Sequence, residues 1–158
     1  MIALDLSLEA EGWAALGDPE AFAGRALAAA LAASPLAPRG DVAISLLLAD
    51  DAAIRELNRD WRGQDQATNV LSFPAAPFRG PGPRPLGDVA LALETVAAEA
   101  EAEGKTLAEH AAHLLVHGCL HLLGHDHDTI EAAGEMESVE VEALARLGVA
   151  NPYSGMAA

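Results

Sequence analysis

The chain has 158 residues and a mass of 16.3 kDa, enough for one domain with its own core. Its composition, 51% apolar and 21% charged, excludes a disordered chain, and its single cysteine excludes a disulfide framework. The net charge of −15 disfavours non-specific binding to nucleic acid. No apolar stretch approaches the ~20 residues that span a bilayer, and no secretory signal is visible. We therefore expect a single cytoplasmic domain over residues 1–158, without a membrane partner.

Apolar periodicity and capping residues predict the elements in chain order. Strands are expected at residues 2–8, 42–49, 70–73 and 87–93. Helices are expected at residues 18–33, 50–62, 94–103, 106–123 and 129–147. Residues 74–85 hold five prolines and two glycines, which predicts an irregular surface loop. The arrangement indicates an α+β fold, with a mixed sheet of about four strands packed against helices.

The six histidines all lie between His110 and His127, and three of them recur every four residues. His113, His117 and His121 therefore form one stripe on an α-helix, with neighbours ~6 Å apart along its axis. His113 and His121 are ~12 Å apart on this axis, too far to bind one ion. A site with three histidines needs one adjacent pair and a third ligand from elsewhere.

The pair formed by His117 and His121 is followed by such a third ligand. Gly124 is suited to the left-handed conformation that ends a helix, and His127 comes three residues later. This spacing is the one by which metzincins bind catalytic zinc. Three imidazoles leave the fourth coordination position open, as in catalytic zinc sites. We therefore predict one zinc ion on His117, His121 and His127, held by a helix and the turn after it.

The residues after His117 argue against a protease. Zincins carry glutamate directly after the first histidine as the general base, whereas this chain has Gly118. Glycine inside a helix costs ~1 kcal/mol relative to alanine. We therefore expect a neighbouring strand or the substrate backbone to approach this position closely. Cys119 should face away from the histidine stripe, as a small buried apolar side chain.

Other polar residues near this motif have more than one interpretation. His110 and His113 lie on the same helix and either face solvent or support the site. His125 either forms a wall of the site or has another role. Asp126 either orients a ligand imidazole or, together with Asp128, caps the last helix.

A second unusual segment is rich in positively charged residues. Five of the nine cationic residues fall between Arg55 and Arg84. Arg62 ends a predicted helix and opens a polar loop, where its planar guanidinium is suited to grip a phosphate. The alternative is that Arg62 interacts only with the dipole of its own helix.

Together these segments resemble the YbeY family of metal-dependent bacterial endoribonucleases, which are implicated in ribosomal RNA maturation and ribosome quality control. Residues 117–127 resemble the signature H-G-x-L-H-L-x-G-x-D-H, and residues 57–74 and 86–89 resemble two further blocks. The resemblance covers most of residues 42–147. It implies an α+β fold, one zinc ion on the three histidines and Arg62 as an important residue of the cleft.

The sequence departs from the family pattern at three positions. Gln64 and Gln66 stand where lysine is frequent, and His125 stands where tyrosine is frequent. The absent lysines weaken the local positive charge, whereas the zinc ligands are unaffected.

The resulting hypothesis is a zinc-dependent endoribonuclease that acts on single-stranded ribosomal RNA, with the ribosome or its proteins as partners and without DNA. Arg62 would be catalytic and would stabilise charge on the scissile phosphate. Two alternatives stay open. A metallopeptidase-like zinc hydrolase would need a carboxylate base, for which Asp126, Asp128 and Glu135 are the candidates. A non-catalytic ribosome assembly factor would use the metal only to hold the helix end.

Overall fold

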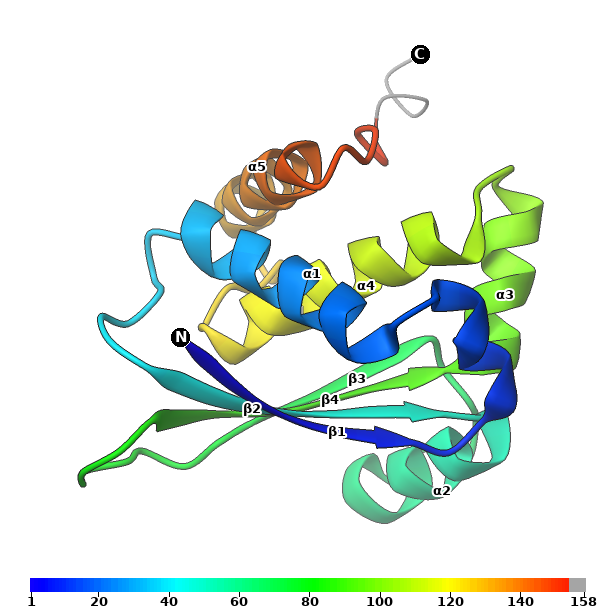
Figure 1. Ribbon diagram of the computed structural model, residues 1–158, viewed down its shortest axis with the longest axis horizontal. Coiled ribbons are helices and arrows are strands. Elements are labelled where there is room, and N and C mark those ends of the chain that lie inside the picture. The colour runs from blue at the N-terminus through cyan, green and yellow to red at the C-terminus, as the bar shows by residue number, and fades with distance from the viewer. Residues whose placement is uncertain (154–158) are drawn as a thin grey trace.

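A mixed four-stranded sheet in the order β1-β2-β4-β3 forms the base of the computed structural model, which describes residues 1–153 (Figure 1). The first three strands in this order are parallel, and β3 is antiparallel to β4. The strands are β1 (Ile2–Leu8), β2 (Val42–Ala49), β3 (Val70–Pro74) and β4 (Arg84–Ala92). The α+β fold predicted from the sequence is confirmed, although residues 154–158 of the predicted domain lie outside the described part.

Helices cover one face of this sheet, while α2 lies on the opposite face (Figure 1). The helical elements are η1 (Glu11–Leu16), α1 (Pro19–Ala33), α2 (Asp51–Arg62), α3 (Leu93–Ala102), α4 (Leu107–Leu122) and α5 (Ile130–Arg146). Capping side chains determine the residues at which several of these helices begin. Asp18 accepts a hydrogen bond from the amide of Ala21 at the start of α1, and Thr106 forms a capping box with Glu109 at the start of α4.

The core lies between the sheet and the helices above it. Alternate residues of β2, among them Ile44, Leu46 and Leu48, are buried as the two-residue period of a strand requires. Helix α4 is buried on most sides and packs against α1, α3, α5, β3 and β4. The predicted histidine pair is therefore carried by the most enclosed helix of the described chain.

The structure differs from the predicted elements at two places. β3 includes Pro74, and β4 begins at Arg84 instead of 87, because Arg84 and Pro85 pair with β2. The irregular loop predicted over residues 74–85 is therefore limited to residues 75–83. Proline is tolerated near the first residue of a strand, where its missing amide breaks few hydrogen bonds. The short helix η1 was not predicted, and it buries Trp13, whose indole Nε1 donates to the carbonyl of Ala49 at 3.0 Å. Among residues 1–153, no helix has the length and apolar character needed to cross a membrane.

Candidate metal centre

Three imidazoles converge where α4 ends. His117 and His121 lie one turn apart on α4, and Gly124 follows with a φ of +104°. The amide of His125 donates to the carbonyl of Leu120 at 3.0 Å, which closes the turn. The chain then brings His127 back, so that one ring nitrogen from each of the three predicted ligands lies within 4.8 Å of the others. The turn at the glycine is what makes this convergence possible.

The hydrogen bonds of the imidazoles determine which nitrogens face the site. The carboxylate Oε1 of Glu140 lies 2.7 Å from Nδ1 of His117, and the carbonyl of His125 lies 3.0 Å from Nδ1 of His121. Both oxygens accept, so each Nδ1 carries the proton and each Nε2 keeps a free lone pair.

These two Nε2 atoms lie 3.0 Å apart. Two lone pairs at this distance repel each other unless a proton or a metal ion lies between them. Zinc–nitrogen bonds of ~2.0–2.1 Å in a tetrahedral site place neighbouring nitrogens about 3.3 Å apart, close to the observed separation. The donor set of neutral imidazoles is also one that zinc prefers. The three histidines therefore fit the predicted metal ion.

The protonation state of His121 favours the same role. Burial lowers the pKa of His121, and the neighbouring His117 lowers it further by charge repulsion. A metal ligand must be the neutral imidazole, so the protein environment holds His121 in the form that binds.

Glu140 is a residue of the candidate centre that the sequence analysis missed. It lies on α5, is 1% exposed, and accepts hydrogen bonds from His117, from Nε2 of His113 at 3.0 Å and from the hydroxyl of Tyr153. Burial alone would raise the pKa of Glu140, but these hydrogen bonds outweigh it and lower the pKa to about 2. A sequence signal existed: Glu140 falls on a buried stripe of α5 with Met136.

His125 is not a wall of the centre. Its buried ring turns to the end of α1, where Nε2 lies 2.8 Å from the hydroxyl oxygen of Ser34. Burial lowers the pKa of this imidazole. Only the backbone carbonyl of His125 reaches the site, where it orients His121.

The remaining polar candidates have local partners. Asp126 accepts a hydrogen bond from the amide of Asp128, and the side chain that caps α5 belongs to Thr129. Within the described residues, the carboxylate bonded to a predicted ligand imidazole is thus Glu140 and not Asp126. His110 is buried and pairs through Nε2 with Glu99 at 2.8 Å.

Gly118 and Cys119 behave as predicted. A Cβ at Gly118 would lie 2.9 Å from Cγ1 of Val89 and 3.1 Å from Oγ of Ser72, so two strands approach this position closely. Cys119 is fully buried, and burial raises the pKa of its thiol to about 12.

Arg62 reaches the edge of the sheet. Its Nη2 donates to the carbonyl of Ser72 at 2.6 Å, and its guanidinium carbon lies 5.2 Å from the ring centroid of Phe73. Ser72 also donates from its hydroxyl to the carbonyl of Gly118 at 3.3 Å, the residue after His117. The strand β3 therefore connects Arg62 with the ligand-bearing part of α4.

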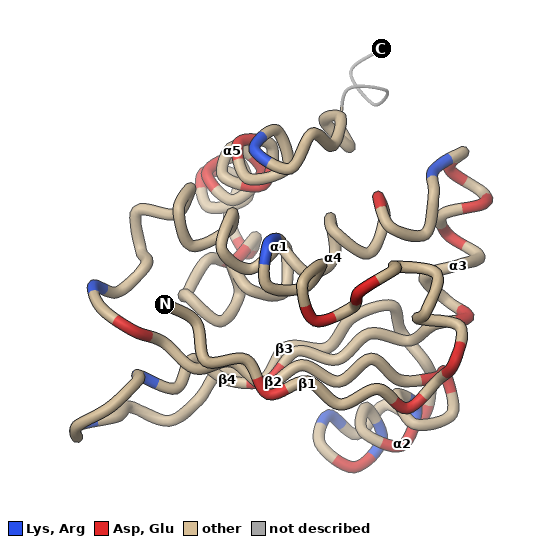
Figure 2. The backbone as a smooth tube through the Cα atoms, viewed as in Figure 1, with Lys and Arg blue, Asp and Glu red and all other residues tan. Residues whose placement is uncertain are grey.

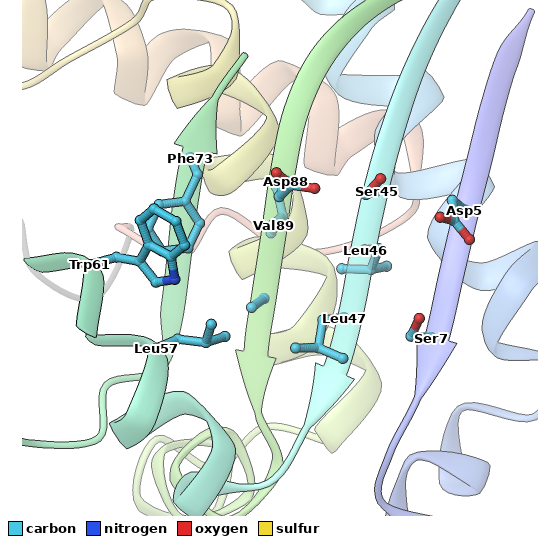
Figure 3. A pocket seen from close by; sticks show the side chains of 11 residues that line it. Asp5, Ser7, Ser45, Leu46, Leu47, Leu57, Trp61, Phe73, Asp88 and Val89 are labelled. Carbon is cyan, nitrogen blue, oxygen red and sulfur yellow. The ribbon is translucent and has the colours of Figure 1, made fainter. Parts of the chain in front are cut away.

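Two hollows flank this edge. One of about 480 Å³ lies on the sheet face that carries α2 and is lined by Leu57, Trp61 and Phe73, with Asp88 and Asp5 across the strands (Figure 3). Trp61 beside it is 74% exposed.

The other hollow, of about 410 Å³, adjoins the metal centre through His113 and His117. Asn69, Glu99 and Tyr153 also line it. The sheet thus separates the larger hollow from the histidines.

Fold and site together define an α+β protein with a candidate centre for one divalent metal ion that three imidazoles hold. A profile described as Endoribonuclease YbeY matches residues 18–148. The chain belongs to the YbeY endoribonuclease family.

Two curated relatives match over almost their full length. Endoribonuclease YbeY of Paramagnetospirillum magneticum is 54% identical, over 96% of this chain and 94% of the relative. Endoribonuclease YbeY of Azorhizobium caulinodans is 52% identical, over 96% of each. The solution structure of TM1509 from Thermotoga maritima is similar in fold, with a TM-score of 0.57 and 24% identity over 94% of this chain and 92% of that one.

Proposed function

We propose that this protein is a cytoplasmic zinc-dependent endoribonuclease that cleaves single-stranded ribosomal RNA during ribosomal RNA maturation and ribosome quality control. The observation that carries the proposal is the convergence of His117, His121 and His127, whose ligand atoms lie within 4.8 Å of one another, in a chain whose relatives are named endoribonucleases. One zinc ion per chain would be held by these three residues.

When bound, zinc would supply a Lewis acid and an activated water at neutral pH. The protein's own residues would orient the site. Glu140 and the carbonyl of His125 keep the Nδ1 protons of His117 and His121 in place, so that both Nε2 atoms face the same point.

Arg62 would bind the phosphate of the RNA. Its guanidinium is exposed, and its hydrogen bond to Ser72 uses one of five N–H donors. The remaining donors suit a phosphate oxygen on which negative charge grows during cleavage. Ser72 accepts from Arg62 through its carbonyl and donates to the carbonyl of Gly118 through its hydroxyl, so one residue of the edge strand β3 links Arg62 to the helix that carries the centre.

The charge of the protein predicts how RNA would be bound. Acidic residues occur along most elements, and the basic residues of α2 lie among acidic ones (Figure 2). With a net charge of −15, binding to bare RNA should be weak and strongly salt-dependent. Basic ribosomal proteins would supply the missing attraction, which makes the ribosome the expected partner.

The contacts of two nearby acids weigh against their use as the base of a metallopeptidase, which leaves Asp128 and Glu135 as the candidates for that alternative. Glu140 is buried and already accepts three hydrogen bonds, so it is not free to activate a water molecule. Asp126 is engaged by the backbone of Asp128. The assembly-factor alternative makes a different claim, namely that Arg62 has no role in bond cleavage.

The test compares Arg62→Ala with Arg59→Ala, a matched control on the same helix whose side chain pairs with Asp60. Cleavage of a single-stranded ribosomal RNA fragment is measured together with the zinc content. We expect Arg62→Ala to keep one zinc equivalent and to lose about 100- to 1000-fold in cleavage rate, by analogy with removal of one charge-stabilising donor. Arg59→Ala should remain near wild type.

A second variant, His121→Ala, should lose both zinc and cleavage. Full cleavage by Arg62→Ala would contradict the catalytic role of this residue, and absence of cleavage by wild type with zinc bound would favour the assembly factor. Zinc-dependent cleavage of casein that His121→Ala abolishes would favour the peptidase.

A further inference from the structure

A partly buried hydrogen-bond network around Glu140 joins the candidate metal centre to the C-terminal end of the described chain. At its middle lies Glu140, whose Oε1 faces Nδ1 of His117 at 2.7 Å and whose Oε2 faces Nε2 of His113 at 3.0 Å. The hydroxyl of Tyr153 donates to the same Oε2. One carboxylate from α5 therefore binds two imidazoles of α4 and a phenol that follows α5.

The network leaves Glu140 one orientation. Its two oxygens are held by different histidines, and its side chain is 1% exposed, so rotation would break buried hydrogen bonds. Within residues 1–153, Nδ1 of His113 is buried without a hydrogen bond, so the polar contact of this imidazole is the one to Glu140. Tyr153 also packs edge-on against His113, with ring centroids 5.8 Å apart and planes at 88°.

We propose that Glu140 is a positioning residue that holds His117 in the Nδ1–H tautomer, and that His113 and Tyr153 hold Glu140 in turn. The metal affinity of the centre then depends on a tyrosine far along the chain from the ligands. This inference rests on the metal site of the proposed function, but not on RNA as the substrate. It also gives His113 a role, although this residue of the histidine stripe is not in the ligand cluster.

The physical reason lies in the two tautomers of imidazole. With an acceptor at Nδ1, the proton of His117 stays there and Nε2 is free to bind a cation. A glutamine at the position of Glu140 offers only one acceptor oxygen to the donors that two carboxylate oxygens serve, and its NH2 group can face Nδ1 of His117 instead. The population of His117 with the proton on Nε2 then rises, and this form does not bind metal through Nε2. Loss of such a carboxylate partner typically weakens metal affinity 10- to 100-fold.

The experiment measures Zn²⁺ affinity by chelator competition for wild type, Glu140→Gln, Tyr153→Phe and Glu142→Gln. Glu142 is the matched control, because it lies on the same helix, is exposed, and contacts Arg146 at 3.2 Å. We expect a 10- to 100-fold loss for Glu140→Gln, a loss of about 3- to 10-fold for Tyr153→Phe, and no change for Glu142→Gln.

A second readout detects the tautomer directly. Long-range ¹H–¹⁵N correlation spectra of the metal-free protein should show His117 in the Nδ1–H form in wild type and a mixture in Glu140→Gln. A purely structural role for Glu140 would not move this signal. Should Glu140→Gln fail to fold by circular dichroism, Tyr153→Phe carries the test, because it removes one hydroxyl from a half-buried ring.

The outcomes separate this inference from the proposed function. Zn²⁺ affinity within twofold of wild type in the folded variants, or an unchanged His117 tautomer, would overturn the inference even if RNA cleavage were observed. Conversely, the expected affinity losses in a protein that cleaves no RNA would uphold the inference and contradict the proposed ribonuclease.

Discussion

The hydroxyl of Ser72 donates a hydrogen bond of 3.3 Å to the carbonyl of Gly118, which places the edge strand β3 directly against α4 beside the first histidine of the centre. The contact needs a residue without a side chain on the helix, because the space where a Cβ would lie is already bounded by Val89 and Ser72. The absence of a side chain at Gly118 is thus explained by packing. The contact between Ser72 and Gly118 also means that a shift of β3 would move the part of α4 that carries the first histidine.

Replacing this glycine should destabilise the protein. Alanine at Gly118 gains up to ~1 kcal/mol in helix propensity, but its Cβ would meet Cγ1 of Val89 at 2.9 Å, and such overpacking costs ~1–3 kcal/mol. We expect Gly118→Ala to lower the free energy of unfolding by up to about 2 kcal/mol. Urea denaturation of the wild type and the variant measures this change in the free energy of unfolding.

Gly134→Ala on α5 is the matched control. No atom lies within 4 Å of its Cβ position, so the substitution should stabilise by about 0.5–1 kcal/mol. A stabilising Gly118→Ala would show that the strands yield easily and that the close contact has no energetic importance.

Removal of the metal should lower thermal stability. A ligand that binds only the folded state at 100 times its Kd stabilises by about 2.7 kcal/mol. We therefore expect EDTA to lower the Tm of the zinc-loaded protein by several degrees. The same treatment should leave His121→Ala unchanged, since that variant lacks a ligand. An equal response of both proteins would show that the metal is bound elsewhere.

Cys119 should be unreactive in the native state. It is fully buried, and burial raises its thiol pKa to about 12, so the reactive thiolate is scarce at pH 8. We expect labelling by DTNB at least about 1000-fold slower than for a free cysteine, because reaction requires opening of the core. Urea above the unfolding midpoint should restore rapid labelling. Fast labelling without denaturant would contradict the packing of α4.

The capping box of α4 should produce a pH dependence. The backbone hydrogen bond from Thr106, together with its side chain, lowers the pKa of Glu109 below its ordinary value of 4.5. The unfolded chain therefore binds more protons in this range, so the stabilisation by Glu109 is present above pH 4.5 and is lost as the pH falls through its folded pKa.

The comparison is with Glu109→Gln, whose amide accepts the same hydrogen bond and does not titrate. Thermal unfolding at pH 6.5 and 3.5 should show that the wild type loses its stability advantage over the variant at the lower pH. An advantage that stays constant would mean that the Glu109 carboxylate adds nothing through its charge.

What the sequence determined concerns residues close together along the chain. A helix repeats every 3.6 residues whatever surrounds it, so the spacing of His117 and His121 is enough to place them on one face. A glycine suited to positive φ then predicts the turn that returns His127. Cap residues and prolines located most helix ends for the same local reason.

Only the tertiary structure decided which distant groups support these residues. Glu140 contacts His117 because α5 packs beside α4. Arg62 donates to the carbonyl of Ser72 because β3 joins the sheet next to β4. The ring of His125 turns to Ser34 on α1 instead of entering the site. These partners depend on how the other elements pack around α4. Local spacing in the sequence does not specify this packing, because many chain segments could supply a carboxylate or a hydroxyl at the same point.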